Sequence, residues 1–162
     1  MLPHSELTAD IIDDFGHLCQ SCPVQLRTFG LKKVFNGRIR TISCRDDNVL
    51  IRRLMTMHSL GEVLVVDGGD SLSSALMGDA IADLGRSHGW SGIIIFGAVR
   101  DVAALARADF GIKALGSNPR KSGKTGSGTI DQVIEKAGTT FTPGHWLYCD
   151  EDGILVTPNK LF

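Results

Sequence analysis

Two short apolar runs in the middle of the chain constrain its fold more than any other feature. Residues 62–67 and 92–96 are nearly all apolar, and each run is followed by glycine and by charged residues. Runs of this kind are typical of strands buried on both faces of a sheet. Between them, residues 79–88 have helical spacing, with Ala80, Ile81 and Leu84 on the inner face, and Gly89 is a suitable terminator. We therefore expect strands that deliver charged side chains into loops at their ends.

The flanking segments extend this pattern at both ends of the chain. Thr8 is expected to cap a first helix that buries Ile11 and Phe15 and exposes aspartates on its other side. The remaining patterns predict helices over residues 49–57 and 102–108, strands over 37–44, 73–77 and 110–115, sheet edges over 130–134 and 139–141, and a hairpin of 146–149 and 154–156 around a turn at 150–153. The last six residues are expected either to be disordered or to pack on a neighbouring subunit. Hairpins at the ends argue against a purely doubly wound sheet and favour a mixed, layered α/β domain.

Length and composition bound the class of protein. The 162 residues, 43% hydrophobic, fit one domain spanning residues 1–162. A formal net charge of −1 gives no long-range attraction to nucleic acid or to an anionic membrane. The longest apolar run is far shorter than the roughly 20 residues of a membrane-spanning helix. The N-terminus also lacks a basic region followed by an apolar core, so we expect a soluble cytoplasmic protein.

Cysteine and histidine residues give weaker indications. Cys19 and Cys22 have C-x-x-C spacing, but a zinc site needs two more ligands, and a thioredoxin-like motif normally follows a strand rather than a helix. Free cytosolic thiols are the simpler interpretation, with metal or redox use as the alternative. His58 and His145 are candidates for a site, although each also fits a structural or surface position.

A basic loop resembles a phosphate-binding loop without matching it. Residues 118–125, Asn-Pro-Arg-Lys-Ser-Gly-Lys-Thr, approximate the pattern G-x-x-x-x-G-K-[ST]. Asn118 replaces the first glycine, and Pro119 lacks a backbone donor that a phosphate cradle uses. The Gly-Ser-Gly that follows Thr125 is a poor helix start. We therefore expect a flexible surface loop that approaches an anionic substrate or a neighbouring subunit, and not a nucleotide hydrolase.

The spacing of three charged residues carries the functional hypothesis. Asp79 is followed by twenty residues and then by Arg100 and Asp101, with Gly78 before the first aspartate and Gly97 before the arginine. Each residue alone fits an ordinary helix start, where an acid lies favourably near the positive end of the helix dipole. The free amides at such a start also suit a carboxylate ligand.

The D-x20-R-D spacing resembles the pattern of a known family, which groups the 4-hydroxy-4-methyl-2-oxoglutarate aldolases with the regulator of ribonuclease E activity A. The resemblance extends over most of the chain. It includes the N-terminal helix, Val-Leu-Val-Val-Asp-Gly-Gly at 63–69, Ile-Ile-Ile-Phe-Gly-Ala-Val-Arg at 93–100, and the hairpin that begins Gly-His-Trp-Leu-Tyr-Cys-Asp at 144. The regulator has a neutral residue at the last position of the pattern, so the presence of Asp101 favours the enzyme.

This resemblance implies an α/β fold, an αββα sandwich with mixed sheets similar to a swivelling phosphohistidine domain. It also implies a homotrimer or dimer of trimers, with sites near subunit interfaces. The implied activity is a divalent-metal-dependent aldolase that cleaves 4-hydroxy-4-methyl-2-oxoglutarate, or a related 4-hydroxy-2-oxo acid, to pyruvate. Decarboxylation of oxaloacetate passes through the same enolate and is an expected second activity.

The resemblance also implies a role for each matched residue. Asp101 is the ligand of a Mg²⁺ or Mn²⁺ ion, and Arg100 holds the substrate and offsets the enolate charge. Asp79 positions a water that takes the proton of the C4 hydroxyl. The amides that bind the pyruvyl carboxylate are those of Gly78, Asp79, Ala80 and Ile81. The alternative function is a non-catalytic regulator that binds and inhibits ribonuclease E.

Overall fold

The computed structural model of the protein describes residues 4–162. Its helices are α1 (Thr8–Phe15), the 3-10 turn η1 (Gly16–Leu18), α2 (Val49–Met55), α3 (Asp79–Ser87) and α4 (Val102–Leu105). Its strands are β1 (Gln20–Ser21), β2 (Arg27–Thr28), β3 (Phe35–Ser43), β4 (Val63–Asp67), β5 (Ala75–Met77), β6 (Gly92–Val99), β7 (Gly111–Ser117), β8 (Thr129–Ile130), β9 (Ile134–Lys136), β10 (Thr139–Phe141), β11 (Trp146–Cys149) and β12 (Ile154–Thr157).

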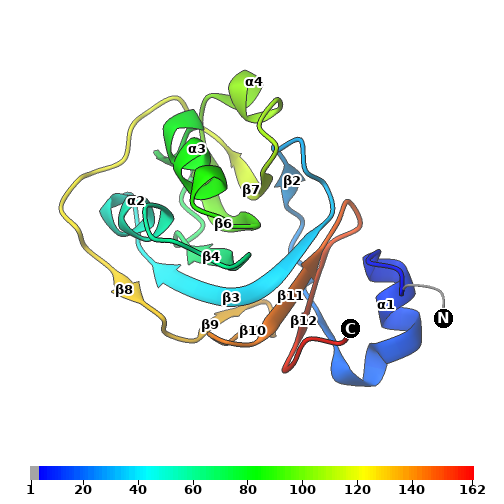
Figure 1. The fold of residues 1–162 in the computed structure, drawn as a ribbon. Helices are drawn as coiled ribbons and strands as arrows, with labels where there is room; N and C mark the ends of the chain where they lie inside the picture. Colours follow the sequence, from blue (N-terminus) through cyan, green and yellow to red (C-terminus); the bar gives the residue numbers. More distant parts are fainter. Residues whose placement is uncertain (1–3) are drawn as a thin grey trace.

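The long strand β3 joins the two halves of one mixed sheet. The strand order is β1-β12-β11-β3-β4-β6-β7-β2, with β5 paired to β6 and β8 paired to β3. The strands β3, β4, β6 and β7 run parallel to one another, whereas β11 and β12 form an antiparallel hairpin beside β3. A separate hairpin of β9 and β10 lies near this pair in Figure 1. The parallel strands therefore end at one edge of the sheet, as the buried apolar runs predict.

Three apolar clusters separate the elements into α, β, β and α layers (Figure 1). The first cluster lies between α2, α3 and the parallel strands, and includes Leu64 and Ile95. The second lies between the opposite face of those strands and the β11–β12 hairpin, and includes Val65 and Phe96. The third packs α1 against the outer face of the hairpin through Ile11. This is the mixed αββα sandwich that the family resemblance implies, and the central strands are buried on both faces because a layer covers each of them.

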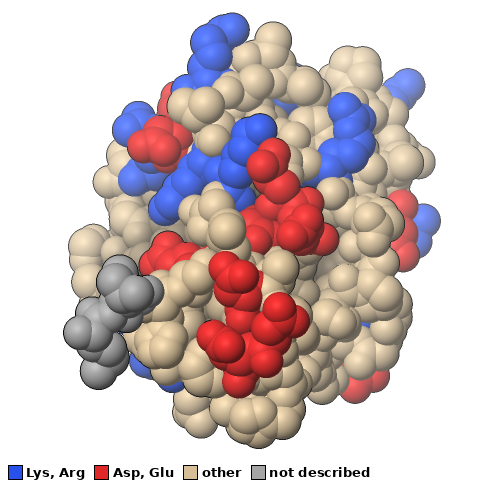
Figure 2. Space-filling view, turned by 90° about the vertical axis from the view of Figure 1, so that its right-hand side faces the viewer, with Lys and Arg blue, Asp and Glu red and all other residues tan. Residues whose placement is uncertain are grey.

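The first helix has its aspartates where the sequence places them. Figure 2 shows acidic side chains gathered on the face where α1 lies, with lysine and arginine side chains beside them. The expected cap is wrong, however. Leu7 is the N-cap residue, and Thr8 is the buried first residue of the helix. The backbone N–H and the hydroxyl of Thr8 both donate to Asp150, each at 2.7 Å, so a carboxylate from the β11–β12 turn caps this helix.

Several other predicted element boundaries differ from those in the structure. Residues 130–134 are not one edge strand but the end of β8, a short connection and the start of β9, which turns back into β10. The helix predicted over residues 102–108 is only the single turn α4. The C-terminus packs on its own chain: the Leu161 backbone N–H donates to the Tyr148 hydroxyl at 2.8 Å, and the Phe162 ring lies 5.6 Å from that of Tyr148. The two-residue strands β1 and β2 were not predicted.

The helix α3 packs closely on its neighbours. Ile81 is buried as predicted, but Ala80 is exposed and Ala82 is buried in its place. A Cβ atom at Gly85 would lie 2.6 Å from the Met55 Sδ atom, so α2 approaches α3 closely at this glycine. This packing fixes the direction in which the start of α3 points. None of the helices between residues 4 and 162 is long and apolar enough to cross a membrane.

Candidate functional site

A cavity of about 100 Å³ lies where the start of α3 meets three neighbouring segments. One wall is formed by residues that the spacing pattern singled out: Gly78, Asp79, Ala80, Ile81, Arg100 and Asp101. The opposite wall comes from the start of α2 and from the basic loop, through Asn48, Arg52, Lys121, Ser122 and Lys124. The cavity is well below the roughly 300 Å³ at which pockets for drug-sized ligands begin, so its size suits a small metabolite.

The start of α3 presents its first amide to a carboxylate from another loop. Gly78 is the N-cap residue in an extended conformation, and no side chain of its own segment caps the helix. The backbone N–H of Asp79 instead donates to the Asp101 Oδ2 atom at 3.1 Å. Such a helix start attracts anions because its amides are unpaired and its dipole is positive there. The structure therefore already holds a carboxylate at this position.

Glycine at position 78 makes this contact possible. A Cβ atom there would lie only 2.3 Å from the Asp101 Oδ2 atom and 3.3 Å from the Arg100 Cγ atom. The backbone angles of Gly78, φ −133° and ψ −160°, are ones that any residue adopts. The requirement for glycine is therefore one of space and not of conformation.

Arg100 and Asp101 are placed by the end of β6. The Arg100 backbone N–H donates to the Met77 carbonyl at 2.9 Å, which continues the pairing of β5 with β6 into the site. Asp101 then turns in the left-handed region, at φ 59° and ψ 40°, where aspartate is more readily accommodated than most residues. Its exposed carboxylate is thereby directed back towards α3. The half-buried Arg100 also reaches the Pro119 carbonyl, at 3.5 Å.

The basic loop is anchored at its end. Asp47 is 4% exposed and accepts hydrogen bonds from the Thr125 hydroxyl at 2.8 Å, the Thr125 amide at 2.5 Å and the Gly126 amide at 3.1 Å. Burial by itself would raise the pKa of Asp47, but these hydrogen bonds outweigh it and hold the pKa below its ordinary value. A flexible surface loop was expected, and instead this stretch is tied to the start of α2.

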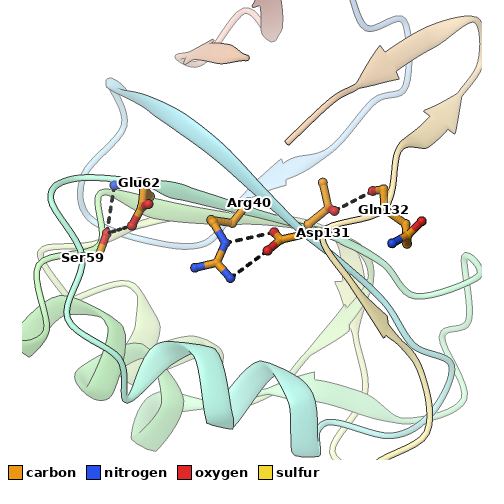
Figure 3. A network of polar contacts seen from close by, with 6 residues as sticks. Arg40, Ser59, Glu62, Asp131 and Gln132 are labelled. Carbon is orange, nitrogen blue, oxygen red and sulfur yellow. Dashed lines mark hydrogen bonds and ion pairs between the residues drawn. The ribbon is translucent and has the colours of Figure 1, made fainter. Parts of the chain in front are cut away.

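A second anchor lies where the basic loop returns to the sheet. Figure 3 shows Arg40 of β3 donating from Nε and from a terminal nitrogen to the two carboxylate oxygens of Asp131, each at 2.9 Å. The neighbouring Thr41 hydroxyl donates to the Gln132 carbonyl at 2.6 Å. The chain is thus fixed at the end of the basic loop and again just after β8, and Ser122 within the loop lines the cavity.

The carboxylates at the cavity suit a hard divalent cation. Within residues 4–162, no three His, Cys, Asp or Glu side chains converge into a metal cage. Asp101 nevertheless presents a second oxygen, Oδ1, that accepts no hydrogen bond from the described residues, and Asp79 lies beside it at the same cavity. Mg²⁺ is commonly bound through one or two carboxylates while water and substrate oxygens complete its shell. The donor set therefore fits Mg²⁺ or Mn²⁺ and does not fit a structural zinc site.

The structure brings Asp79, Arg100 and Asp101 to one cavity, although twenty residues separate the first from the other two. The other candidates lie elsewhere. His58 is exposed, and His145 lines a different cavity, together with Cys19. All four cysteines are free thiols, and burial raises the pKa of Cys19 and takes that of Cys149 to about 12.

The wall that lies opposite α3 was not predicted from the sequence. No local pattern at Asn48 or Arg52 indicates what faces them. The basic loop did carry an indication, since its lysines were expected to approach an anionic ligand. Ser122 gave no such indication, because the sequence does not show whether a serine hydroxyl is buried.

The fold and the cavity define the class: a layered α/β sandwich that brings a helix start, an arginine and a carboxylate to one small cavity. The sequence matches the family described as Aldolase/RraA over residues 8–156. The chain therefore belongs to the RraA-like family.

Solved structures agree with this assignment. A structure named S-adenosylmethionine:2-dimethylmenaquinone methyltransferase, from Geobacillus kaustophilus, is 39% identical, with a TM-score of 0.94 and 96% of each chain covered. The RNA-processing inhibitor RraA from Thermus thermophilis is 36% identical, with a TM-score of 0.93, covering 100% of this chain and 96% of that one. A Streptomyces coelicolor member of the RNase ES inhibitor RraA family is 22% identical with a TM-score of 0.74, covers 97% of this chain and 80% of that one, and supports the fold alone. These names point to different activities, so similarity by itself does not select one.

Proposed function

We propose that this protein is a divalent-metal-dependent lyase that cleaves a 4-hydroxy-2-oxo acid, such as 4-hydroxy-4-methyl-2-oxoglutarate, to pyruvate, and that also decarboxylates oxaloacetate. The observation that carries the proposal is the convergence of the α3 start, Arg100 and Asp101 on one small cavity. The four free thiols are compatible with a reducing cytoplasmic location.

The chain's own residues have distinct tasks in this reaction. The amides at the start of α3 that Asp101 leaves free bind the pyruvyl carboxylate, as helix starts bind anions. Arg100 donates to the 2-oxo oxygen and stabilises the negative charge that develops there in the enolate. Asp79 positions a water that accepts the proton of the C4 hydroxyl. Asp101, with Asp79 nearby, would hold a Mg²⁺ or Mn²⁺ ion, which when bound supplies Lewis-acid polarisation of the substrate oxygens.

The cleavage reaction balances without an oxidant or a reductant. The C3–C4 bond breaks, and its electron pair becomes the C2–C3 double bond of the enolate as the 2-oxo oxygen takes the charge. The C4 hydroxyl loses its proton and becomes the carbonyl of the released product. Protonation of the enolate at C3 gives pyruvate. In oxaloacetate the same C3–C4 bond breaks, and carbon dioxide leaves in place of the carbonyl product.

The test is pyruvate release from oxaloacetate and from 4-hydroxy-4-methyl-2-oxoglutarate, with Mg²⁺ or Mn²⁺ and with EDTA. Turnover is expected only with metal, and is expected to collapse in Arg100→Ala and Asp101→Ala. Arg86→Ala is a matched control, because Arg86 is exposed at the far end of α3. Turnover of both substrates at the uncatalysed rate with metal present would refute the proposal.

A second candidate function follows from the RNA-processing inhibitor among the similar structures. In that case the protein binds ribonuclease E, or a related nuclease, through its surface and needs no chemistry at the cavity. A pull-down with the nuclease tests this function, and Asp101→Ala should leave such binding unchanged. Absence of binding at micromolar concentration counts against it.

We also propose a homotrimeric assembly, which sedimentation analysis tests directly.

A further inference from the structure

The Arg100 side chain borders two separate hollows. One is the cavity at the start of α3, and the other is a space of about 250 Å³ lined by Arg100, Asp101, Val102, Ser117, Asn118 and Pro119. None of the ion pairs formed within residues 4–162 involves Arg100. A long side chain that no carboxylate holds can rotate into either space, and ordering it costs conformational entropy. Its direction therefore depends on whatever neutral contact the chain provides.

That contact is the backbone carbonyl of Pro119. A terminal nitrogen of Arg100 donates to this oxygen at 3.5 Å, and no other hydrogen bond within residues 4–162 involves the guanidinium group. At this length the hydrogen bond is weak, so it restrains Arg100 only while the carbonyl itself stays in place. Because the acceptor is neutral, the positive charge of Arg100 is left available to a substrate.

Asn118 fixes the position of this carbonyl through three hydrogen bonds. Its backbone N–H donates to the Val99 carbonyl at 3.0 Å, which ties the basic loop to the end of β6 directly before Arg100. Its side-chain Nδ2 donates to the Leu72 carbonyl at 2.8 Å, in the connection between β4 and β5. Its Oδ1 accepts from the Arg120 amide at 2.9 Å and closes a turn around the proline. The start of the basic loop is thereby held on both sides of the carbonyl.

We propose that Asn118 is a positioning residue that keeps Arg100 directed at the cavity, by holding the Pro119 carbonyl against its guanidinium group. This inference rests on the proposed function, because it explains how the donor to the enolate oxygen is kept in place. Asn118 itself does not line the cavity and touches no reacting atom. The two departures from a phosphate-binding loop thus have a role: asparagine supplies the tethers, and proline presents a carbonyl on a backbone of fixed φ.

Asn118→Ala removes both side-chain hydrogen bonds and leaves the proline in place. With Mg²⁺ and oxaloacetate, kcat is expected to fall about tenfold, because a donor that is displaced from the developing charge stabilises the transition state less. KM should change by less than about twofold, since the charge on the 2-oxo oxygen develops only after binding.

Asn36→Ala is the matched control. The Asn36 side chain accepts a hydrogen bond from the Trp146 indole N–H at 3.2 Å, and Asn36 lines neither hollow. This variant therefore loses a side-chain hydrogen bond of the fold without touching Arg100, and both kinetic constants should match those of the wild type. An equal fall of kcat in the two variants would show that Asn118 acts only on the fold.

A double-mutant cycle shows whether Asn118 acts through Arg100. In the Arg100→Ala background, assayed at high protein concentration, Asn118→Ala should change kcat/KM by less than about twofold, because residues that act as a unit are not additive. A further tenfold loss in that background would assign the effect of Asn118 to another part of the basic loop and overturn the inference.

Motion of the arginine gives a readout that needs no turnover. The ¹⁵N relaxation of the Arg100 Nε–H group in the free protein should give a lower order parameter in Asn118→Ala than in the wild type, and an unchanged one in Asn36→Ala. An order parameter that Asn118→Ala leaves unchanged would overturn the inference whatever the kinetics. Failure of the proposed function is distinct, since metal-dependent pyruvate release would then be absent in the wild type while the relaxation result still stands.

Discussion

Two helices of this protein begin at a carboxylate that comes from a distant part of the chain, and the two carboxylates differ in what else they do. At the start of α1, Asp150 is 3% exposed and accepts hydrogen bonds from Thr8, Asp152 and Gly153. At the start of α3, Asp101 is exposed and accepts one hydrogen bond, from the Asp79 amide. Asp150 has little capacity left for a ligand, whereas Asp101 has one oxygen available beside a cavity. The difference separates a carboxylate whose hydrogen bonds are all used within the fold from one that keeps an oxygen free at a cavity, as the proposed function requires.

The largest expected effect is that of Asp101→Asn on turnover. The side chain is exposed, so the free energy of unfolding should change by no more than about 1 kcal/mol, the usual cost of losing a helix cap. Metal-dependent pyruvate release should fall at least about 100-fold, because the proposed metal ligand loses its charge. Steady-state kinetics and urea unfolding on the same preparations measure the two effects. A large loss of stability with intact turnover would show that Asp101, like Asp150, acts only on the fold.

Asp150→Asn should show the opposite pattern. The amide nitrogen of asparagine cannot accept from Thr8, so buried donors are left unpaired and the free energy of unfolding should fall by about 2 to 3 kcal/mol. Turnover per folded molecule should not change, because the α1 start lies outside the cavity. Urea unfolding midpoints, together with activity at a temperature where the variant is folded, provide the check. Normal stability would mean that the α1 cap is dispensable.

Gly78→Ala sharpens the comparison at the α3 start. The added methyl group would lie where the Asp101 Oδ2 atom now sits, so the carboxylate must move, and we expect about a tenfold loss of turnover. Gly16→Ala is the control, since a Cβ atom there has Ile12 as its nearest neighbour at an ordinary 3.8 Å. Equal activity of the two variants would contradict a requirement for the present position of Asp101.

The smallest effect concerns acid stability. Burial alone would raise the pKa of Asp150, but hydrogen bonds from Thr8, Asp152 and Gly153 outweigh it and lower the pKa. A carboxylate whose pKa is lowered by folding stabilises the protein above its unfolded-state pKa of about 3.9, and this contribution is lost as the pH falls through the native pKa. Unfolding free energies measured between pH 6 and pH 2.5 should therefore decline less steeply in Asp150→Asn than in the wild type. Parallel declines would assign the acid sensitivity to other groups, such as Asp47.

These features differ in how far the sequence predicts them. The apolar runs at residues 62–67 and 92–96 predict buried strands correctly, because alternation is absent only where both faces are covered. The separation of Asp79 from Arg100 and Asp101 led to the family and to one wall of the cavity. Their catalytic and metal-binding roles remain predictions.

The other features of the fold and of the cavity depend on contacts between distant residues, which no local sequence pattern indicates. Thr8 looked like a cap because threonine is a common cap residue, yet the capping group lies 142 residues away on Asp150. The position of Ser122 at the cavity depends on Asp47, which is 75 residues earlier and accepts hydrogen bonds from the loop near it. The position of Arg52 at the cavity similarly depends on the packing of α2 against α3.

Binding of oxalate, a non-reacting mimic of the pyruvate enolate, tests the central claim most directly. Calorimetric titration of the wild type should give a 1:1 complex with Mg²⁺ present and none with EDTA. Asp101→Asn should not bind in either condition, whereas Asp150→Asn should bind like the wild type. Oxalate binding that is independent of Mg²⁺, or that persists in Asp101→Asn, would contradict a metal-dependent site at the start of α3.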